Sequence, residues 1–268
     1  MPTKLEEIVA ATRRRVANSR RTADLRDLEK RAQDRSPRGF RKALETKGRN
    51  GIAIIAELKK ASPSKGLIRA DFNPEILASE LASAGATALS VLTDEEYFQG
   101  SLENLRIASD ATKIPCLRKD FMVDEFQLLE ACTYHADAIL LIVAALSQTE
   151  LVGLTMLGRE YGLDVLCEVH GATELDRAIN AGCNLIGVNS RNLHTFNVDL
   201  NTAYELAQRM PKNVIGVAES GIHTGADIAK LHAAGFQAFL IGESLMKAES
   251  PGNALRTLIA EASPATTH

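Results

Sequence analysis

The sequence predicts an α/β protein, a (β/α)8 TIM barrel with an N-terminal helical extension. The chain of 268 residues is 45% apolar and 24% charged, a composition typical of a globular protein with a sizeable core. From residue 51 onward, eight short β-rich runs alternate with stretches of helical periodicity, and the joins between them resemble one another. Barrels of this kind commonly have about 250 residues, so one domain fits the length.

The first 48 residues are predicted to form the helical extension, and residues 49–268 the barrel. Apolar residues recur at near-helical spacing, at Leu5, Ile8, Val9, Val16, Leu25 and Leu28. Residues 1–49 contain 15 Lys and Arg against 7 Asp and Glu, whereas the whole chain has a net charge of −3. A basic arm can bind nucleic acid. The interleaved apolar residues instead indicate amphipathic helices that pack on the protein, so no nucleic-acid partner is expected.

The remaining chain supplies the eight strands and seven helices of the predicted barrel. The strands are expected at residues 52–56, 88–92, 114–117, 138–143, 165–169, 185–188, 214–218 and 238–241. The helices are expected at residues 74–84, 102–110, 125–134, 148–161, 174–181, 200–209 and 226–234. An open doubly wound sheet is the alternative, but such a sheet usually carries Gly-x-Gly-x-x-Gly after its first strand, and this sequence does not.

Several classes of protein and site are not expected. The longest apolar run is residues 138–146, far below the roughly 20 residues of a membrane-spanning helix, so no membrane partner is expected. The N-terminus lacks an apolar signal core, which predicts a cytoplasmic location. No Cys or His cluster has metal-site spacing, so no metal is expected. The four cysteines are predicted to be reduced core thiols, at Cys116, Cys132, Cys167 and Cys183.

Polar side chains follow several of the predicted strands, where barrel active sites lie. They include Glu57 and Lys59 after the first strand, Lys119 after the third, Glu168 at the end of the fifth, Asn189 and Arg191 after the sixth, and Glu219 after the seventh. Any single one is compatible with a surface charge. Together they must pair with one another or bind a ligand, because unpaired charge at a partly buried mouth is costly. Lysine opposite glutamate also suits acid–base chemistry.

Two turns with glycine predict a phosphate site. Ser220 and Gly221 follow the seventh strand, and Gly242 and Glu243 follow the eighth. Backbone N–H groups at such glycines can approach an anion, and these barrels usually hold phosphate after strands seven and eight.

Five segments resemble the indole-3-glycerol-phosphate synthase family, at residues 54–66, 92–101, 118–121, 187–193 and 217–222. Residues 39–44 are similar to the N-terminal extension of that family, whose helices lie over the barrel mouth. The resemblance implies a cofactor-free reaction of tryptophan biosynthesis. In it, 1-(2-carboxyphenylamino)-1-deoxyribulose 5-phosphate closes its pyrrole ring and loses carbon dioxide and water to give indole-3-glycerol phosphate.

The resemblance also implies roles for individual residues. Lys119 would protonate the ketone as general acid, Lys59 would hold the substrate carboxylate and share acid duty, and Glu168 would move a proton during dehydration. Glu57 and Asn189 would orient the lysines and the sugar hydroxyls. The substrate-binding residues would be Ser62, Ser220, Gly221, Gly242 and Glu243 at the phosphate, Phe98, Phe121, Leu140 and Leu193 around the anthranilate ring, Arg191 at the carboxylate, and Glu219. Glu243 stands where other members have serine, and Arg191 has a structural ion pair as its alternative role.

Two other functions are open to the same fold. Phosphoribosylanthranilate isomerase would be expected to use a Cys/Asp pair, but Glu57 and Lys59 stand at the first strand end. A scaffold barrel without activity would be expected to have lost the charged strand ends, and this sequence has them. The expected partner is therefore a small phosphorylated anthranilate substrate, with the protein a monomer or a weak homodimer.

Overall fold

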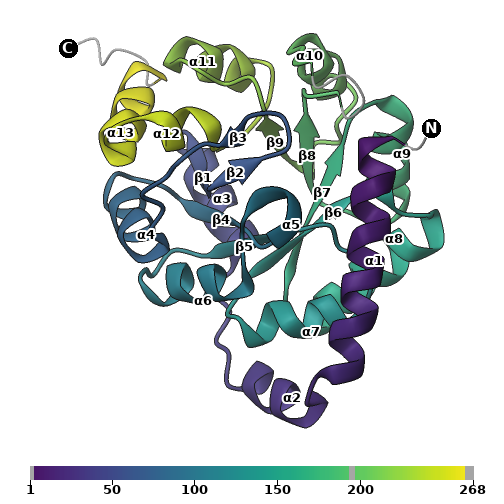
Figure 1. Cartoon of the computed structure of the whole chain (residues 1–268). Coiled ribbons are helices and arrows are strands. Elements are labelled where there is room, and N and C mark those ends of the chain that lie inside the picture. The colour runs from purple at the N-terminus through teal and green to yellow at the C-terminus, as the bar shows by residue number, and fades with distance from the viewer. Residues whose placement is uncertain (1–2, 193–196, 263–268) are drawn as a thin grey trace.

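The computed structural model describes residues 3–192 and 197–262. Eight parallel strands close into a barrel in the order β1-β10-β9-β8-β7-β6-β5-β4, with β4 paired to β1 (Figure 1). Their bounds are β1 (Ala53–Leu58), β4 (Ala88–Leu92), β5 (Cys116–Lys119), β6 (Ala138–Ile142), β7 (Asp164–Val169), β8 (Leu185–Asn189), β9 (Ile215–Glu219) and β10 (Ala238–Ile241). The predicted (β/α)8 barrel is confirmed.

A helix follows each barrel strand and covers the outside of the barrel (Figure 1). In chain order these are α4 (Pro74–Ser83), α6 (Leu102–Asp110), α7 (Phe126–Thr133), α8 (Gln148–Glu160), α9 (Ala172–Asn180), α10 (Asn201–Ala207), α11 (Gly225–Ala233) and α13 (Pro251–Ala262). Ser147 and Thr224 start α8 and α11 with capping boxes, which satisfy the free N–H groups of the first turn. Within the described ranges, no helix is long and apolar enough to cross a membrane.

The structure adds several elements to the prediction and shifts some strand bounds, most of all the start of the third strand. The unpredicted short elements are the hairpin β2 (Ala61–Ser62) and β3 (Gly66–Leu67), the helices α5 (Glu95–Phe98) and α12 (Glu243–Lys247), and the 3₁₀ turn η1 (Val143–Ala145). They have too few residues to show periodicity. The last outer helix, α13, was also not predicted, although it has 12 residues. The third barrel strand begins at Cys116 rather than at residue 114, because Pro115 has no N–H for the ladder.

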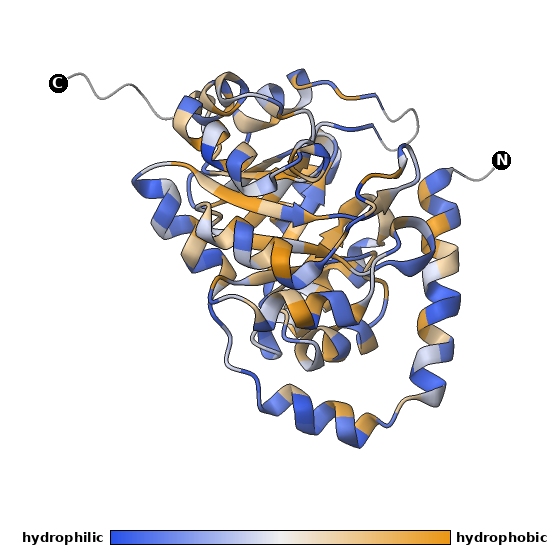
Figure 2. Ribbon diagram, turned by 60° about the vertical axis from the view of Figure 1, so that its left-hand side comes forward, coloured by the Kyte–Doolittle hydropathy of each residue, from blue (hydrophilic) through white to orange (hydrophobic). Residues whose placement is uncertain are grey.

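Two apolar clusters form the core, one inside the barrel and one between the strands and the outer helices. Along β1, Ala53 and Ile55 belong to the inner cluster, whereas Ile54, Ala56 and Leu58 belong to the outer one. Figure 2 shows the same division, with mostly apolar strands inside helices that carry polar outer faces. Alternation therefore decides which strand residues point into the barrel.

The N-terminal helices occupy both ends of the barrel. Helix α1 (Lys4–Thr22) runs along one side of the barrel mouth, and α2 (Leu25–Gln33) packs beside α7 (Figure 1). In α3 (Phe40–Arg49), Phe40 and Leu44 are fully buried in the inner cluster, beside residues that begin the strands. The expectation that residues 1–48 all lie over the mouth is therefore wrong for α3, which closes the opposite end.

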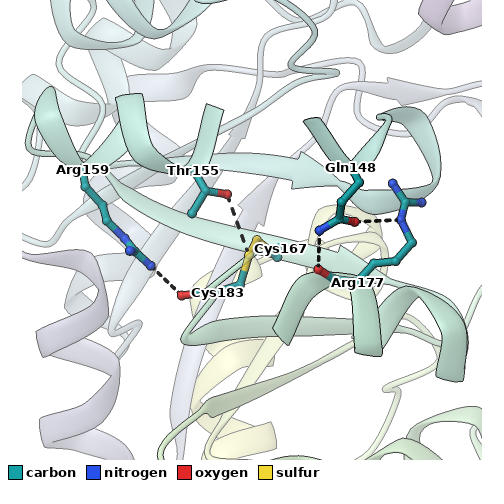
Figure 3. The surroundings of a disulfide bond; sticks show 7 residues. Gln148, Thr155, Arg159, Cys167, Arg177 and Cys183 are labelled. Atoms are coloured by element: carbon teal, nitrogen blue, oxygen red, sulfur yellow. Dashed lines mark hydrogen bonds between the residues drawn. A yellow bond between two sulfur atoms is a disulfide. The ribbon is translucent and has the colours of Figure 1, made fainter. Parts of the chain in front are cut away.

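Two of the four cysteines are joined in a disulfide, so the prediction of reduced thiols is wrong for this pair. Cys167 faces outward on β7 and Cys183 lies in the turn before β8, with their Cα atoms 6.5 Å apart (Figure 3). The oxygen Oγ1 of Thr155 on α8 lies 3.9 Å from the Cys183 sulfur. Cys116 and Cys132 are buried free thiols, as predicted.

Candidate active site

A cavity of ≈ 170 Å³ opens at the carboxyl ends of the strands. The predicted residues that line it are Glu57, Lys59, Ser62, Phe98, Lys119, Phe121, Leu140, Glu168, Asn189, Arg191, Glu219, Ser220 and Glu243. Gly221 and Gly242 lie beside it, in the turns after β9 and β10. Leu193 lies outside the described residues.

Strand alternation brings the charged side chains to this cavity. Leu117 on β5 and Leu166 on β7 belong to the inner cluster, so Lys119 and Glu168, two residues further on, also point inward. Strands β1, β5, β7, β8 and β9 carry apolar residues inside the barrel and place a polar side chain at or just after their carboxyl ends, whereas β6 and β10 contribute Leu140, Ile142 and Leu240 to the mouth. The same periodicity that builds the core thus positions the site.

Each lysine is held by a carboxylate. Lys59 Nζ lies 2.7 Å from Glu57 Oε1, and Lys119 Nζ lies 2.7 Å from Glu168 Oε2. Lys119 Nζ is also 3.7 Å from Glu219 Oε2. The three carboxylates are buried, so their charges interact strongly with the lysines.

The protonation states of these groups diverge. Burial would lower the pKa of Lys119, but Glu168, Glu219 and Glu57 outweigh it and hold that pKa above its ordinary value. Burial would likewise raise the pKa of Glu168, but Lys119 and His170 hold it well below the usual range. The pKa of Glu219 is raised by burial and by Glu168. The site therefore combines an ionised carboxylate, a protonated lysine and a second carboxyl group that retains its proton to higher pH, an arrangement suited to acid–base chemistry.

One wall of the cavity is apolar. The rings of Phe98 on α5 and Phe121 after β5 lie 6.2 Å apart at 40°, a tilted aromatic pair. Leu140 on β6 is buried beside them, and Leu5 and Ile8 on α1 complete the lining. A flat aromatic ring fits between such surfaces.

The opposite wall combines amide, hydroxyl and guanidinium groups. Asn189 Oδ1 accepts hydrogen bonds from Ser220 Oγ at 2.8 Å and from the Arg191 N–H at 3.0 Å, which leaves the Asn189 amide N–H groups to donate to a ligand. Arg191 Nη2 lies 3.5 Å from Glu243 Oε2, the ion pair given as its alternative role. Ser220 and Gly221 have φ values of 63° and 79°, so the chain turns sharply after β9.

Gly242, predicted as a phosphate-binding residue, also has a protein neighbour that the sequence did not indicate. A Cβ at this position would lie 2.5 Å from Glu57 Oε1 and 2.8 Å from Glu57 Cβ. The missing side chain therefore leaves room for the Glu57–Lys59 pair. Spacing along the sequence could not reveal this contact, because β1 and β10 become neighbours only when the barrel closes.

Some site residues were not predicted. Lys4, Leu5 and Ile8 line the cavity from α1, and the only sequence signal was the helical spacing of the two apolar residues. His170 contacts Glu168 from behind and gave no signal in the sequence. Within residues 3–192 and 197–262, no group of three His, Cys, Asp or Glu side chains is placed to hold a metal ion.

Known proteins resemble this chain in sequence and in fold. Residues 5–258 match the family model described as indole-3-glycerol phosphate synthase. A relative of that name from Koribacter versatilis (strain Ellin345) is 56% identical over 259 residues, which cover 97% of this chain and 100% of the relative.

Two solved structures share the fold alone. Thiamine phosphate pyrophosphorylase from Pyrococcus furiosus has a TM-score of 0.60 at 15% identity, covering 81% of this chain and 96% of its own. 3-Hexulose-6-phosphate synthase has a TM-score of 0.61 at 14% identity, covering 79% of this chain and 99% of its own. Taken with the paired lysines and carboxylates at the barrel mouth, the sequence matches show that the chain belongs to the indole-3-glycerol phosphate synthase family.

Proposed function

We propose that this cavity converts 1-(2-carboxyphenylamino)-1-deoxyribulose 5-phosphate into indole-3-glycerol phosphate, carbon dioxide and water, as a carboxy-lyase of tryptophan biosynthesis. The observation that carries the proposal is that Lys59 and Lys119, each 2.7 Å from a buried carboxylate, line one cavity with the Phe98–Phe121 pair. Cationic groups suit the substrate's two anionic ends, and the aromatic pair suits its ring.

Ring closure needs an acid. The ring carbon that bears the carboxylate attacks the ketone carbon, and the ketone oxygen takes a proton from Lys119. The raised pKa of Lys119 ensures that the proton is present. Carbon dioxide then leaves, and the electron pair of the broken carbon–carbon bond returns to the benzene ring, which becomes aromatic again.

Dehydration needs a base and an acid. Glu168 accepts the proton lost from the substrate carbon beside the nitrogen, and its lowered pKa keeps it ionised beforehand. Lys59, which shares the acid duty, donates the proton with which the hydroxyl group leaves as water. Glu57 holds Lys59 toward the substrate carboxylate, and Arg191 adds a second cation on that side. Asn189 and Ser220 contact the sugar hydroxyls and the phosphate, beside the turns at Gly221 and Gly242.

Two lysine substitutions test this proposal. Purified protein with the substrate, and with no added metal or nucleotide, should form the fluorescent indole product continuously. Lys119→Met should lower kcat by about 10²–10⁴-fold with a much smaller change in KM. Lys59→Met should raise KM at least as much as it lowers kcat, because its charge partners the carboxylate before the reaction begins.

Lys113→Met is the matched control, since Lys113 is exposed just before β5, at the opposite end of the barrel from the cavity. It should leave both constants unchanged. Wild-type kcat in Lys119→Met would transfer the acid role to Lys59. An absence of indole product from the wild type would refute the proposed function. The cytoplasmic location and the monomeric or weakly dimeric state stay predictions from the sequence.

A further inference from the structure

We propose that His170 is a positioning residue for Glu168, holding from behind the carboxylate that moves the proton and linking it to Glu174 on α9. The proposal rests on the proposed function, because it takes Glu168 as the group that moves the proton. His170 does not line the cavity. Its role would therefore be exerted through Glu168 and not by touching the substrate.

The two oxygens of Glu168 face two different cations. Lys119 Nζ lies 2.7 Å from Oε2, and His170 Nε2 lies 3.3 Å from Oε1. The second contact has the distance of an ion pair but not the angle of a hydrogen bond, since Nε2 is a buried nitrogen without a hydrogen-bond partner. Such contacts are often loose without substrate and tighten when it binds.

Glu174 holds the histidine ring from the other side. Its Oε2 accepts the backbone N–H of His170 at 2.8 Å and lies 3.1 Å from Nδ1 of the same residue. Glu174 stands in the first turn of α9, where the helix dipole favours a carboxylate and the cap residue Gly171 offers no side chain. The Glu174 carboxylate thus binds the backbone just before α9 and also holds the imidazole.

These contacts form a line from the helix to the reacting group, Glu174–His170–Glu168–Lys119. The side chains of His170 and Glu168 are only 11% and 2% exposed, so water screens their interaction little. The ionisable side chains that act on His170 are Glu168 from β7 and Glu174 from α9. An imidazole between two carboxylates keeps both of its protons, because each carboxylate favours an N–H that faces it.

The charge of the ring follows from this placement. Burial would lower the pKa of His170, but Glu168 and Glu174 outweigh it and raise that pKa to about 9. Because the folded-state pKa lies above the ordinary 6.5, the ion pairs stabilise the fold fully below pH 6.5, and this stabilisation is lost as pH rises through about 9. Below about pH 9 the charged His170 ring favours the ionised form of Glu168. It also keeps Glu168 Oε1 turned away from Lys119.

The test uses three substitutions of similar size. His170→Gln keeps an N–H donor and removes the charge. Glu174→Gln keeps an acceptor for the backbone N–H of His170 and removes the outer carboxylate. His135→Gln is the matched control, because His135 also contacts a carboxylate, Asp110 at 2.6 Å, but on the protein surface.

The kinetic measurement is kcat and KM from pH 4 to pH 10. His170→Gln should lower kcat about tenfold or more near neutral pH while KM stays within about threefold. Its acid-side kcat transition should move to higher pH, since Glu168 loses a neighbouring cation. Glu174→Gln should give a smaller loss of the same kind, and His135→Gln should give neither. A residue that only packs would change stability but not the pH profile.

The second measurement is an NMR titration of the histidine rings without substrate, with His170→Gln used to assign its signal. His170 should titrate near pH 9, and Glu174→Gln should lower that midpoint. A midpoint near 6.5, or a kcat within twofold of wild type in His170→Gln, would overturn the proposal. The titration needs no turnover, so its failure is distinct from an absence of indole product, which would refute the proposed function itself.

Discussion

At the scale of single residues, the packing of the mouth depends on positions where no side chain fits. Gly187 lies on β8 beside β9, and a Cβ there would overlap Oε1 of Glu219. The carboxyl group of Glu219 is buried and cannot move out to water. The sequence predicted Glu219 as a site residue. The room for its carboxyl group is provided by Gly187 on the neighbouring strand, a contact that only the fold creates.

We expect Gly187→Ala to lower kcat/KM at least about tenfold, because the new methyl group displaces Glu219 from Lys119. A double-mutant cycle isolates this cause: in a Glu219→Ala background the methyl group meets no carboxylate, so Gly187→Ala should add little further loss. Gly153→Ala is the control, since a Cβ there meets nothing within 4 Å, and it should stabilise α8 by about 0.5–1 kcal/mol. If Gly187→Ala and Glu219→Ala lowered kcat/KM additively in the double mutant, the steric explanation would be contradicted.

At the scale of elements, α1 is attached to the barrel through ion pairs of Arg15 with the buried carboxylates of Asp94 and Asp120, through buried side chains such as Val16, and through several surface contacts. Arg15 Nη2 lies 3.1 Å from Asp120 Oδ1, and Asp120 Oδ2 contacts Arg118 at 3.0 Å and Thr93 at 2.7 Å. Burial would raise the pKa of Asp120, but Arg118 and Arg15 outweigh it and hold that pKa below its usual value. Asp120 adjoins Lys119, so this network ties the helix to the end of a strand that bears a site lysine.

Arg15→Ala should lower the free energy of unfolding by about 1–3 kcal/mol and raise KM, since it removes one partner of a buried charge and loosens the helix that lines the cavity. Arg20 on the same helix pairs with Asp124 and Glu125 at the surface, with 48% of its side chain exposed. Arg20→Ala should therefore cost less than about 1 kcal/mol and leave KM unchanged. Urea unfolding and steady-state kinetics measure both, and equal effects of the two substitutions would show that the ion pairs of Arg15 have no special role.

At the scale of the whole molecule, the N-terminal helices α1 and α3 lie at opposite ends of the barrel, and α2 packs beside α7. Lys4, Leu5 and Ile8 on α1 face the cavity, whereas Phe40 and Leu44 on α3 fill the core at the strand starts. We therefore expect this N-terminal segment to contribute to substrate binding at one end and to stability at the other.

Truncations should separate these two contributions. Removal of residues 1–22 should raise KM about tenfold or more and leave a cooperative thermal transition, because the barrel keeps its core. Extending the removal to residue 45 should abolish that transition, since a buried Phe to Ala change alone costs about 3–5 kcal/mol. Circular dichroism melts and substrate titrations distinguish the variants. A shorter truncation with wild-type KM would exclude α1 from substrate binding, and a stable longer one would exclude α3 from the core.

The sequence by itself determined the repeating strand–helix order, the inward direction of residues such as Glu57 and Lys119, and the resemblance that carries the family. These follow from local periodicity, because alternation along a strand assigns each side chain to one face. Tertiary structure alone decided that α3 closes the far end, that Cys167 meets Cys183, that Gly242 makes room for Glu57 and that His170 stands behind Glu168. Each of these depends on which strands and helices become neighbours when the barrel closes. Amphipathicity requires that a helix pack against something, but it does not specify which end of the barrel the helix covers.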